Sequence, residues 1–489
     1  MEKLHHSNCC VYRGYEPTNQ VIQTFNFLDS RGYKIIKKNS HESFQRLWIN
    51  SMLTLDSWRL PFQFRLPSTR LLARTLYAAG LLLGLLISGA QADGSKSPRE
   101  FQLAAAFQLP QLPQVPGLPS LTGPSADWRQ FDSFFTFVVK RFGDDVPANL
   151  KDPLADAFLD SRYELTSAIA PGKGGNPVPE LFINGWKRLS PIMNQALPAL
   201  PQQTASLYSS FIGAADKLAL IGGAGLNLTP DALKGMAKLI APSSTADPLA
   251  YSTNVDSGLR SLLGFGAPLP IPGRQSRLDQ RFLPERDFSF WFGRSALAAE
   301  PAASNLNQML PDPKDLQRYL TAVRSLLVEL SDKIAIKSKL SDEHKPLYRQ
   351  IVFTAAWQES CWRQWIKKGT PVTSTTGDVG LMQVNRNTWR SVYDLKGLNG
   401  DIQYNGNAGG EILLYYLTKH AIRKNEDKQA RGNLARATYS AYNGGPGAVG
   451  RYRGVRQSPV WKKVDEAFWE KFQVVSAGNE IGVKSCYEK

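Results

Sequence analysis

A run of apolar residues that ends in a single carboxylate is the feature that most restricts how this chain can fold. The run reads Ile351-Val-Phe-Thr-Ala-Ala-Trp-Gln-Glu359, and no charged residue occurs between Ile351 and Gln358. A helix with almost no polar face has to be buried on most of its sides. We therefore expect a helix over 344–366 at the centre of a helical domain.

Glu359 lies where this apolar run gives way to a basic stretch that contains Arg363, Lys367 and Lys368. Apolar surroundings favour the neutral form of a carboxyl group, so the pKa of Glu359 should rise toward the range that suits a general acid. Glu359 is therefore the candidate catalytic acid. On this stretch alone, an ordinary carboxylate that caps or pairs near a helix end is an equal alternative.

Three later motifs follow in order. Gly377-Asp-Val-Gly-Leu-Met-Gln383 is a glycine-rich turn that presents an amide side chain. Asn405-x3-Gly409-x2-Ile-Leu413 lies in a helical pattern. Ala441-Tyr-Asn-Gly-Gly-Pro-Gly447 follows a helical pattern and ends it, as Asn-Gly and Pro-Gly sequences do.

Together with Glu359-Ser360, these motifs resemble the lytic transglycosylase domain related to goose-type lysozyme. The resemblance covers roughly 315–475, about a third of the chain. It implies an all-α, lysozyme-like catalytic domain. It also implies cleavage of the β-1,4 bond between N-acetylmuramic acid and N-acetylglucosamine in peptidoglycan, without water and with 1,6-anhydro ends as products.

The resemblance also implies roles for individual residues, with neither a cofactor nor a metal. Glu359 would act first as general acid and then as general base, while Ser360 would orient it or cap the helix. Asp378 is a nearby carboxylate on a motif position that is not catalytic in the family. Substrate-binding roles are implied for Gln383, Tyr442, Ser374, Ser360 and Asn443. Gly377 lies 18 positions after Glu359, which is more than the family's usual spacing, so the role of Ser374 is the one that this difference affects most.

Two other functions fit the same motifs. A hydrolytic muramidase could use the same fold and the same acid, and its products would carry reducing ends. An inactive scaffold that binds the cell wall could also be built on this domain, although the presence of Glu359, Gln383 and Tyr442 together argues against it. The mass of the products separates the first alternative from the lytic reaction, and turnover excludes the second.

Length and charge set wider limits. A chain of 489 residues is too long for a single core, and its net charge of +16 favours anionic partners. We find neither a basic helix with base-reading side chains nor zinc-ligand spacing, so we expect no nucleic-acid partner and no metal site. The expected partner is the glycan strand of peptidoglycan, with association with the membrane or a wall-spanning assembly as a further option.

The first 92 residues predict export. Three arginines, at 65, 70 and 74, precede an apolar core over 76–88, and Ala90-Gln-Ala92 follows, which is the layout of a signal peptide over 65–92. The alternative is an inner-membrane anchor facing the periplasm, although 13 residues are short of the ~20 that span a bilayer. If translation starts at Met52, the residues of the leader (1–64) that precede Met52 are an extension that the cell does not synthesise. We expect a periplasmic mature chain that begins at Asp93.

Two regions separate the signal peptide from the catalytic domain. Residues 93–125 form a Pro-rich spacer, with proline at nearly every third position from 110 to 119, as in polyproline II; a docking ligand is the alternative. Residues 126–310 form a helical accessory region of unknown fold, with helices predicted over 128–142, 153–168, 179–197, 206–220 and 230–240. Its aromatic cluster at Phe282–Phe292 could stack sugars or pack between domains.

The catalytic domain is assigned to 311–489, with helices predicted over 311–334, 344–366, 407–423, 433–442 and 460–475. Cleavage after Ala92 leaves only Cys361 and Cys486 in the mature chain. An even pair of cysteines in an oxidising compartment favours a disulfide, which would fix the polar C-terminal tail to the domain. Two independent thiols are the alternative.

Overall fold

Helices make up most of the structure, a computed structural model that describes residues 124–222, 227–271, 306–454 and 457–488. The predicted leader, the signal peptide, nearly all of the Pro-rich spacer and the aromatic cluster at Phe282–Phe292 lie outside the described residues. Among the residues that are described, no helix combines the length and the apolar character needed to cross a membrane.

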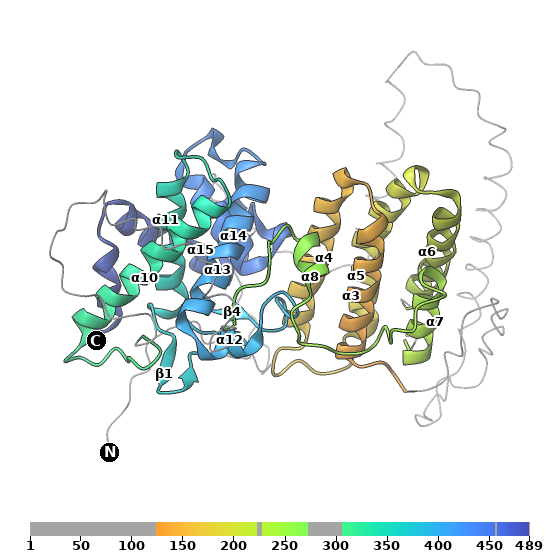
Figure 1. Cartoon of the computed structure of the whole chain (residues 1–489), viewed down its shortest axis with the longest axis horizontal. Helices are drawn as coiled ribbons and strands as arrows, with labels where there is room; N and C mark the ends of the chain where they lie inside the picture. Colours follow the sequence, from red (N-terminus) through yellow and green to blue (C-terminus); the bar gives the residue numbers. More distant parts are fainter. Residues whose placement is uncertain (1–123, 223–226, 272–305, 455–456, 489) are drawn as a thin grey trace, which may run out of the picture. The chain divides into compact units, whose positions relative to one another are not determined.

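All five helices predicted for the accessory region are present, most of them somewhat longer than the patterns indicated (Figure 1). Along the chain α4 packs on α5, α5 on α6 and α6 on α7, while α7 returns to α3. The elements are α3 (Trp128–Asp145), α4 (Ala148–Ala168), α5 (Val178–Ala196), η1 (Leu197–Ala199), α6 (Gln202–Gly222), α7 (Pro230–Ile240) and α8 (Ser257–Leu262).

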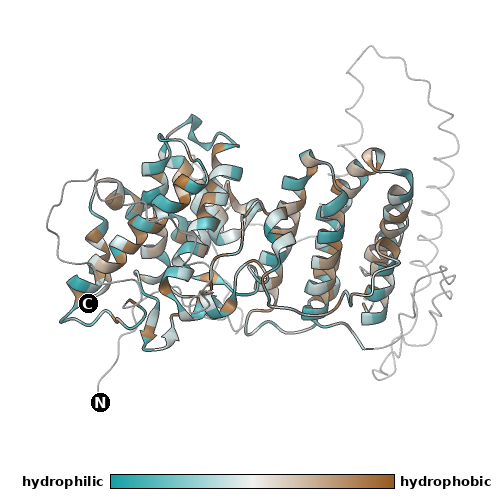
Figure 2. Cartoon of the chain, in the orientation of Figure 1, coloured by the Kyte–Doolittle hydropathy of each residue, from teal (hydrophilic) through white to brown (hydrophobic). Residues whose placement is uncertain are grey.

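Local sequence explains where two of these helices begin. The side chain of Asp127 accepts a hydrogen bond from the backbone N–H of Gln130, and the Gln130 side chain accepts one from the Asp127 N–H, which is a capping box. The Thr229 hydroxyl accepts a hydrogen bond from the Ala232 N–H at 3.2 Å and so caps α7, whose first residue is Pro230. Figure 2 shows apolar residues gathered on one side of several of these helices.

The C-terminal part is also mainly helical. Its helices are α10 (Leu316–Lys337), α11 (Lys345–Ser360), α12 (Leu395–Gly400), α13 (Ile402–Tyr416), α14 (Gly432–Gly444) and α15 (Pro459–Ser476). Shorter helical turns are η4 (Leu417–Ile422), η5 (Glu426–Lys428), η6 (Pro446–Ala448), η7 (Arg451–Arg453) and η8 (Glu480–Cys486). Two antiparallel pairs of short strands complete it: β1 (Trp365–Lys367) with β2 (Thr370–Pro371), and β3 (Asp378–Val379) with β4 (Val384–Asn385).

Helix α11 is central, as its apolar sequence predicts. It packs against α10, α13, α14 and α15, and Ile351, Val352 and Ala355 are fully buried. The prediction of its end was wrong, because the helix stops at Ser360 rather than at 366. Cys361 and Trp362 adopt left-handed backbone conformations with φ of 53° and 59°, and the chain then enters strand β1.

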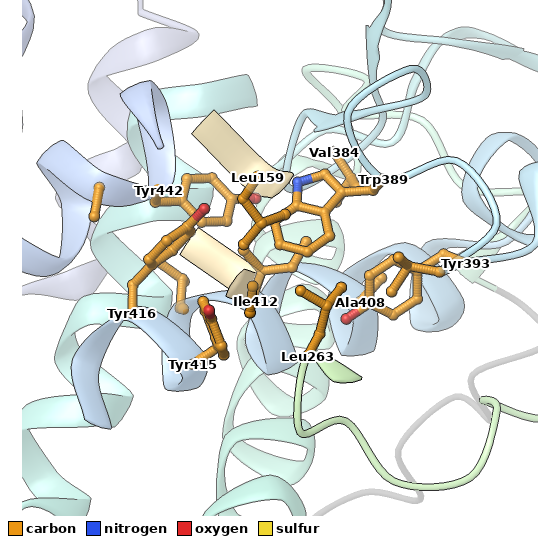
Figure 3. Packing of buried hydrophobic residues seen from close by; sticks show 14 of the residues in the cluster. Leu159, Leu263, Val384, Trp389, Tyr393, Ala408, Ile412, Tyr415, Tyr416 and Tyr442 are labelled. Carbon is orange, nitrogen blue, oxygen red and sulfur yellow. The ribbon is translucent and has the colours of Figure 1, made fainter. Parts of the chain in front are cut away.

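The accessory region and the C-terminal part share one hydrophobic core. All described residues fall within one compact unit, and the core cluster continues from α3 to η8. In Figure 3, Leu159 of α4 and Leu263, which follows α8, lie in the same cluster as Trp389, Tyr416 and Tyr442. The accessory helices therefore contribute to the interior that surrounds the motif residues.

Candidate active site

Glu359 lies in the last turn of α11 and is partly buried. The Tyr439 hydroxyl donates a hydrogen bond to its Oε1 atom at 2.8 Å. Burial raises the pKa of Glu359 to about 8, and the hydrogen bond from Tyr439 opposes this rise only in part. Near neutral pH the carboxyl group therefore carries a proton that it can donate.

Tyr439 is a site residue that the sequence analysis missed. It lies on α14, is almost fully buried, and stacks on Phe468 with 4.0 Å between ring centroids and 3° between planes. This stacking limits the movement of the ring and so fixes the hydroxyl near Glu359. The signal in the sequence is its position three residues before Tyr442, because residues at this spacing share a helix face.

Tyr442 also lies on α14, but its hydroxyl points to another partner. It donates a hydrogen bond to the backbone carbonyl of Met382 at 2.6 Å, which connects α14 to the Gly-Leu-Met-Gln turn. Burial, and then the nearby charge of Glu359, raise the pKa of Tyr442 well above its usual value. The phenol is thus near the acid, and the contact that the structure gives it is with the turn.

The turn that contains Gly380 is packed so closely that only glycine fits at this position. Gly380 has φ of +77°, and an added Cβ would lie 2.4 Å from Gln364 Oε1 and 2.5 Å from Asn405 Nδ2. Asn405, fully buried, donates to the Val379 carbonyl at 2.8 Å and accepts from the Met382 N–H at 2.8 Å. The predicted Asn405 helix therefore fixes the backbone of this turn.

Gln364 is a second residue that the sequence analysis missed. Its Oε1 atom accepts a hydrogen bond from the Leu381 N–H at 2.9 Å, and its amide nitrogen donates to the Leu398 carbonyl at 3.1 Å. Gln364 is fully buried, so both bonds are shielded from water. Gln364 precedes the turn in the chain and Asn405 follows it, so the turn is held by residues on both sides. No pattern in the sequence distinguishes Gln364 from other polar residues.

Gln383 adopts a left-handed backbone conformation with φ of 48° at the end of this turn. Its amide nitrogen donates to the carbonyls of Gly380 at 2.8 Å and Val372 at 3.2 Å, and the side chain is partly buried. Because the two N–H groups of the amide serve these two carbonyls, a donor role toward substrate would require one of these hydrogen bonds to break, whereas Oε1 keeps the acceptor role that the resemblance implies. That role stays a prediction.

Ser374 and Asp378 contact each other within the loop that precedes this turn. The Ser374 hydroxyl donates to Asp378 Oδ2 and accepts from the Asp378 N–H at 3.0 Å. Thr376 Oγ1 donates to the same carboxylate oxygen at 2.5 Å, and Asn385 Nδ2 donates to Asp378 Oδ1 at 2.8 Å. Both oxygens of Asp378 are therefore engaged inside the loop.

Ser360 connects the end of α11 to the turn rather than to Glu359. Its hydroxyl donates to the Leu381 carbonyl at 2.6 Å and accepts from the Arg363 N–H at 3.0 Å.

Asn443 accepts a hydrogen bond from Arg451 at 3.1 Å. Arg451 in turn pairs with Asp465 at 2.7 Å, so Asn443 is linked to α15.

The predicted disulfide between Cys361 and Cys486 is present, with 6.2 Å between the two Cα atoms. It joins the residue that follows Glu359-Ser360 to η8 in the C-terminal tail. The Tyr487 hydroxyl donates to the Cys361 carbonyl beside it. The left-handed end of α11 is therefore attached to the tail by a covalent bond and a hydrogen bond.

Two further features bear on the chemistry. Within the ranges that the structure describes, no group of three His, Cys, Asp or Glu side chains could bind a metal ion. A cavity of about 250 Å³ beside α14 is lined by residues that include Arg436, Arg453 and Asp465. Glu359 is not among its lining residues, so we do not assign this cavity to the reacting atoms.

Residues 341–463 match the family described as transglycosylase SLT domain. The match covers about a quarter of the chain and includes Glu359, the turn at 377–385 and α14. Searches of curated proteins and of solved structures each gave no match. The SLT domain confirms the family resemblance, and α3–α8 lie outside it.

Proposed function

We propose, starting from a transglycosylase SLT domain at residues 341–463, that this protein is a peptidoglycan lytic transglycosylase. The observation that supports this most is Glu359 itself. It is a partly buried carboxyl group whose pKa is raised to about 8 and which accepts a hydrogen bond from Tyr439. Such a group can both donate and accept a proton near neutral pH.

In the first step, Glu359 donates its proton to the glycosidic oxygen between N-acetylmuramic acid and N-acetylglucosamine. The bond from C1 of the muramic acid to this oxygen breaks, and the departing sugar keeps the proton as a hydroxyl. The 2-acetamido oxygen of the substrate stabilises the positive charge at C1. The hydrogen bond from Tyr439 stabilises the Glu359 carboxylate that remains.

In the second step, the Glu359 carboxylate removes the proton from the C6 hydroxyl of the same muramic acid. O6 then bonds to C1 and closes the 1,6-anhydro ring, and Glu359 is protonated again. No water is consumed, and each atom and proton is accounted for. One carboxyl group performs both transfers.

The surroundings of Asp378 favour this route over hydrolysis. Hydrolytic glycosidases generally use two carboxyl groups, the second as base or nucleophile. Asp378 is the carboxylate whose charge most raises the pKa of Glu359, yet Ser374, Thr376 and Asn385 occupy its oxygens. This arrangement gives Asp378 a role in shaping the loop and supports a mechanism with a single catalytic carboxyl group.

Product mass tests the proposal. The purified protein is incubated with peptidoglycan sacculi, and the released fragments are measured by mass spectrometry beside those from a hydrolytic muramidase. We expect fragments one water lighter than the muramidase products. Fragments of equal mass would identify a hydrolase, and the absence of any fragment would favour a wall-binding scaffold.

The proposal extends to substrate contacts and location. Gln383 and Tyr442 are proposed to position the glycan strand, with Ser374, Ser360 and Asn443 shaping the loops around it. A basic enzyme of this kind would act in the periplasm, either free or associated with the membrane or a wall-spanning assembly. Sequencing the amino terminus of the native protein tests this location, with Asp93 expected as the first residue.

A further inference from the structure

One face of α4 in the accessory region contacts the SLT domain along its length. Asp152, Asp156 and Asp160 recur at every fourth residue and so share this face. Lys419 Nζ lies 3.1 Å from Asp152, and His420 Nε2 lies 3.3 Å from Asp156. Farther along the helix, Asp160 accepts a hydrogen bond from the Gly447 N–H at 2.9 Å. The face thus reaches the Ala-Tyr-Asn-Gly-Gly turn.

Tyr163, one turn beyond Asp160, contacts the end of α14. Its hydroxyl donates to the backbone carbonyl of Tyr442 at 2.8 Å and accepts from the Tyr416 hydroxyl at 3.3 Å. The last four carbonyls of a helix have no partner within the helix, and Tyr442 is among the last four residues of α14. Tyr163 therefore satisfies a helix-end carbonyl that belongs to a motif residue.

The turn after α14 fits closely against the same two residues. Gly445 has φ of +89°, and a Cβ placed on it would lie 3.0 Å from both Asp160 Oδ1 and the Tyr163 ring. Helix α4 thus contacts this turn by packing as well as by hydrogen bonds. Farther along α4, Thr166 Oγ1 lies 2.9 Å from Thr388 Oγ1, just beyond the Gly-Leu-Met-Gln turn.

We infer that Tyr163 is a positioning residue for the reaction proposed above, and that it acts through the Tyr442 carbonyl. The last two turns of α14 contain both Tyr439, whose hydroxyl contacts Glu359, and Tyr442, whose hydroxyl contacts Met382. A helix end that frays would displace both hydroxyls from their partners. The accessory region therefore serves the active site directly, by fixing this helix end from outside the SLT domain.

The test compares two tyrosine hydroxyls in the full chain. Tyr163→Phe removes the hydrogen bond to the Tyr442 carbonyl and keeps the ring. Tyr208→Phe is the control, because the buried Tyr208 hydroxyl also has two hydrogen-bond partners, the Arg141 carbonyl at 3.0 Å and Asp145 Oδ2 at 2.9 Å, and both lie inside the accessory region. Turnover of sacculi and amide hydrogen exchange over 441–449 are measured for both variants and the wild type.

We expect Tyr163→Phe to lower kcat about 5- to 10-fold, as the loss of one hydrogen bond would, and to change KM less than about 2-fold. Amides in 441–449 should exchange faster in this variant alone. Tyr208→Phe should lower the melting temperature about as much as Tyr163→Phe does. Its kcat should nevertheless stay within about 2-fold of the wild type.

Equal kcat values and equal exchange in the two variants would overturn the inference. The inference rests on the proposed function only for its turnover measurement. If the wild type released reducing ends, the lytic route would fail, but the comparison of kcat would still hold because hydrolysis also requires Glu359. If the wild type released nothing, the proposed function would fail and amide exchange would decide the role of Tyr163 alone.

Discussion

The ends of two helices meet at Glu359, and they are fixed in different ways. The end of α11 is attached inside the C-terminal part, through the Cys361–Cys486 disulfide and a 2.8 Å hydrogen bond from Tyr319 to the Trp362 carbonyl. The end of α14 accepts a hydrogen bond from Tyr163, and the turn that follows it donates one to Asp160; both residues belong to the accessory region. Glu359, the proposed proton donor, and its partner Tyr439 therefore lie near helix ends that are contacted by separate parts of the chain.

The contact between α4 and the SLT domain includes a buried charge cluster. Asp132 of α3 lies 2.6 Å from Arg390 and 3.3 Å from Arg162 of α4, and all three side chains are at most 3% exposed. Arg162 also donates to the Arg390 carbonyl at 2.6 Å. Such a cluster contributes little net stability when complete, but removal of one member leaves a buried charge without its partner.

The largest expected effect comes from Asp132→Ala, which would disturb the contact between the accessory region and the SLT domain. Two buried guanidinium groups would lose their carboxylate, so we expect a loss of about 3–5 kcal/mol in the free energy of unfolding. Chemical denaturation followed by circular dichroism measures it. Asp332→Ala is the matched control, because the Asp332–Arg349 pair is more than 40% exposed and should contribute at most about 1 kcal/mol. Equal losses in the two variants would contradict this account of the cluster.

A smaller effect is expected on the α11 side. Replacing Cys361 and Cys486 with serine removes a bond between residues 125 positions apart. We expect the free energy of unfolding to fall by about 2–4 kcal/mol, mainly through the entropy of the unfolded chain. Differential scanning calorimetry of the double variant, and of the wild type with and without reductant, measures the change. If reductant lowered the melting temperature of the double variant as much as that of the wild type, the disulfide would not be the cause.

The smallest effect concerns Tyr439, where the two helix ends touch. The hydrogen bond from Tyr439 lowers the pKa of Glu359, so Tyr439→Phe should raise that pKa further, by up to about one unit. The acid form persists to higher pH in this variant. The alkaline limb of the kcat/KM profile, expected near pH 8 in the wild type, should therefore move upward. Tyr442→Phe is the control, because its hydroxyl contacts Met382, and a limb that moved equally in both would refute the assignment.

Much of the helical framework could be predicted from the sequence, because apolar periodicity and capping residues are local signals. The end of α11 could not, since Cys361 and Trp362 adopt left-handed conformations that non-glycine residues rarely take. Contacts from Tyr319 and the C-terminal tail hold them there. Contacts between residues so far apart in the chain cannot be predicted from the hydrophobic pattern around 351–366.

The candidate site was predictable to a similar degree. Motif order identified Glu359 and the two turns, but not which of Tyr439 and Tyr442 contacts the acid, because both lie on the buried face of α14. The stripe of Asp152, Asp156 and Asp160 reads as a solvated helix face in a sequence. Only the folded chain shows that it lies against the SLT domain.

Glu359→Gln tests the central claim, that one carboxyl group performs both proton transfers. The amide can still accept the hydrogen bond from Tyr439 but can neither donate nor take up the reacting proton. We expect no release of fragments from sacculi, with glycan binding retained.

The same variant should be more stable than the wild type at pH 7. The pKa of Glu359 is about 8 in the folded protein against an ordinary 4.5, so the wild type loses stability as pH rises between these values. Removing this cost should raise stability on the order of 1–3 kcal/mol. A Glu359→Gln variant that released fragments at the wild-type rate, or that failed to fold, would contradict the account.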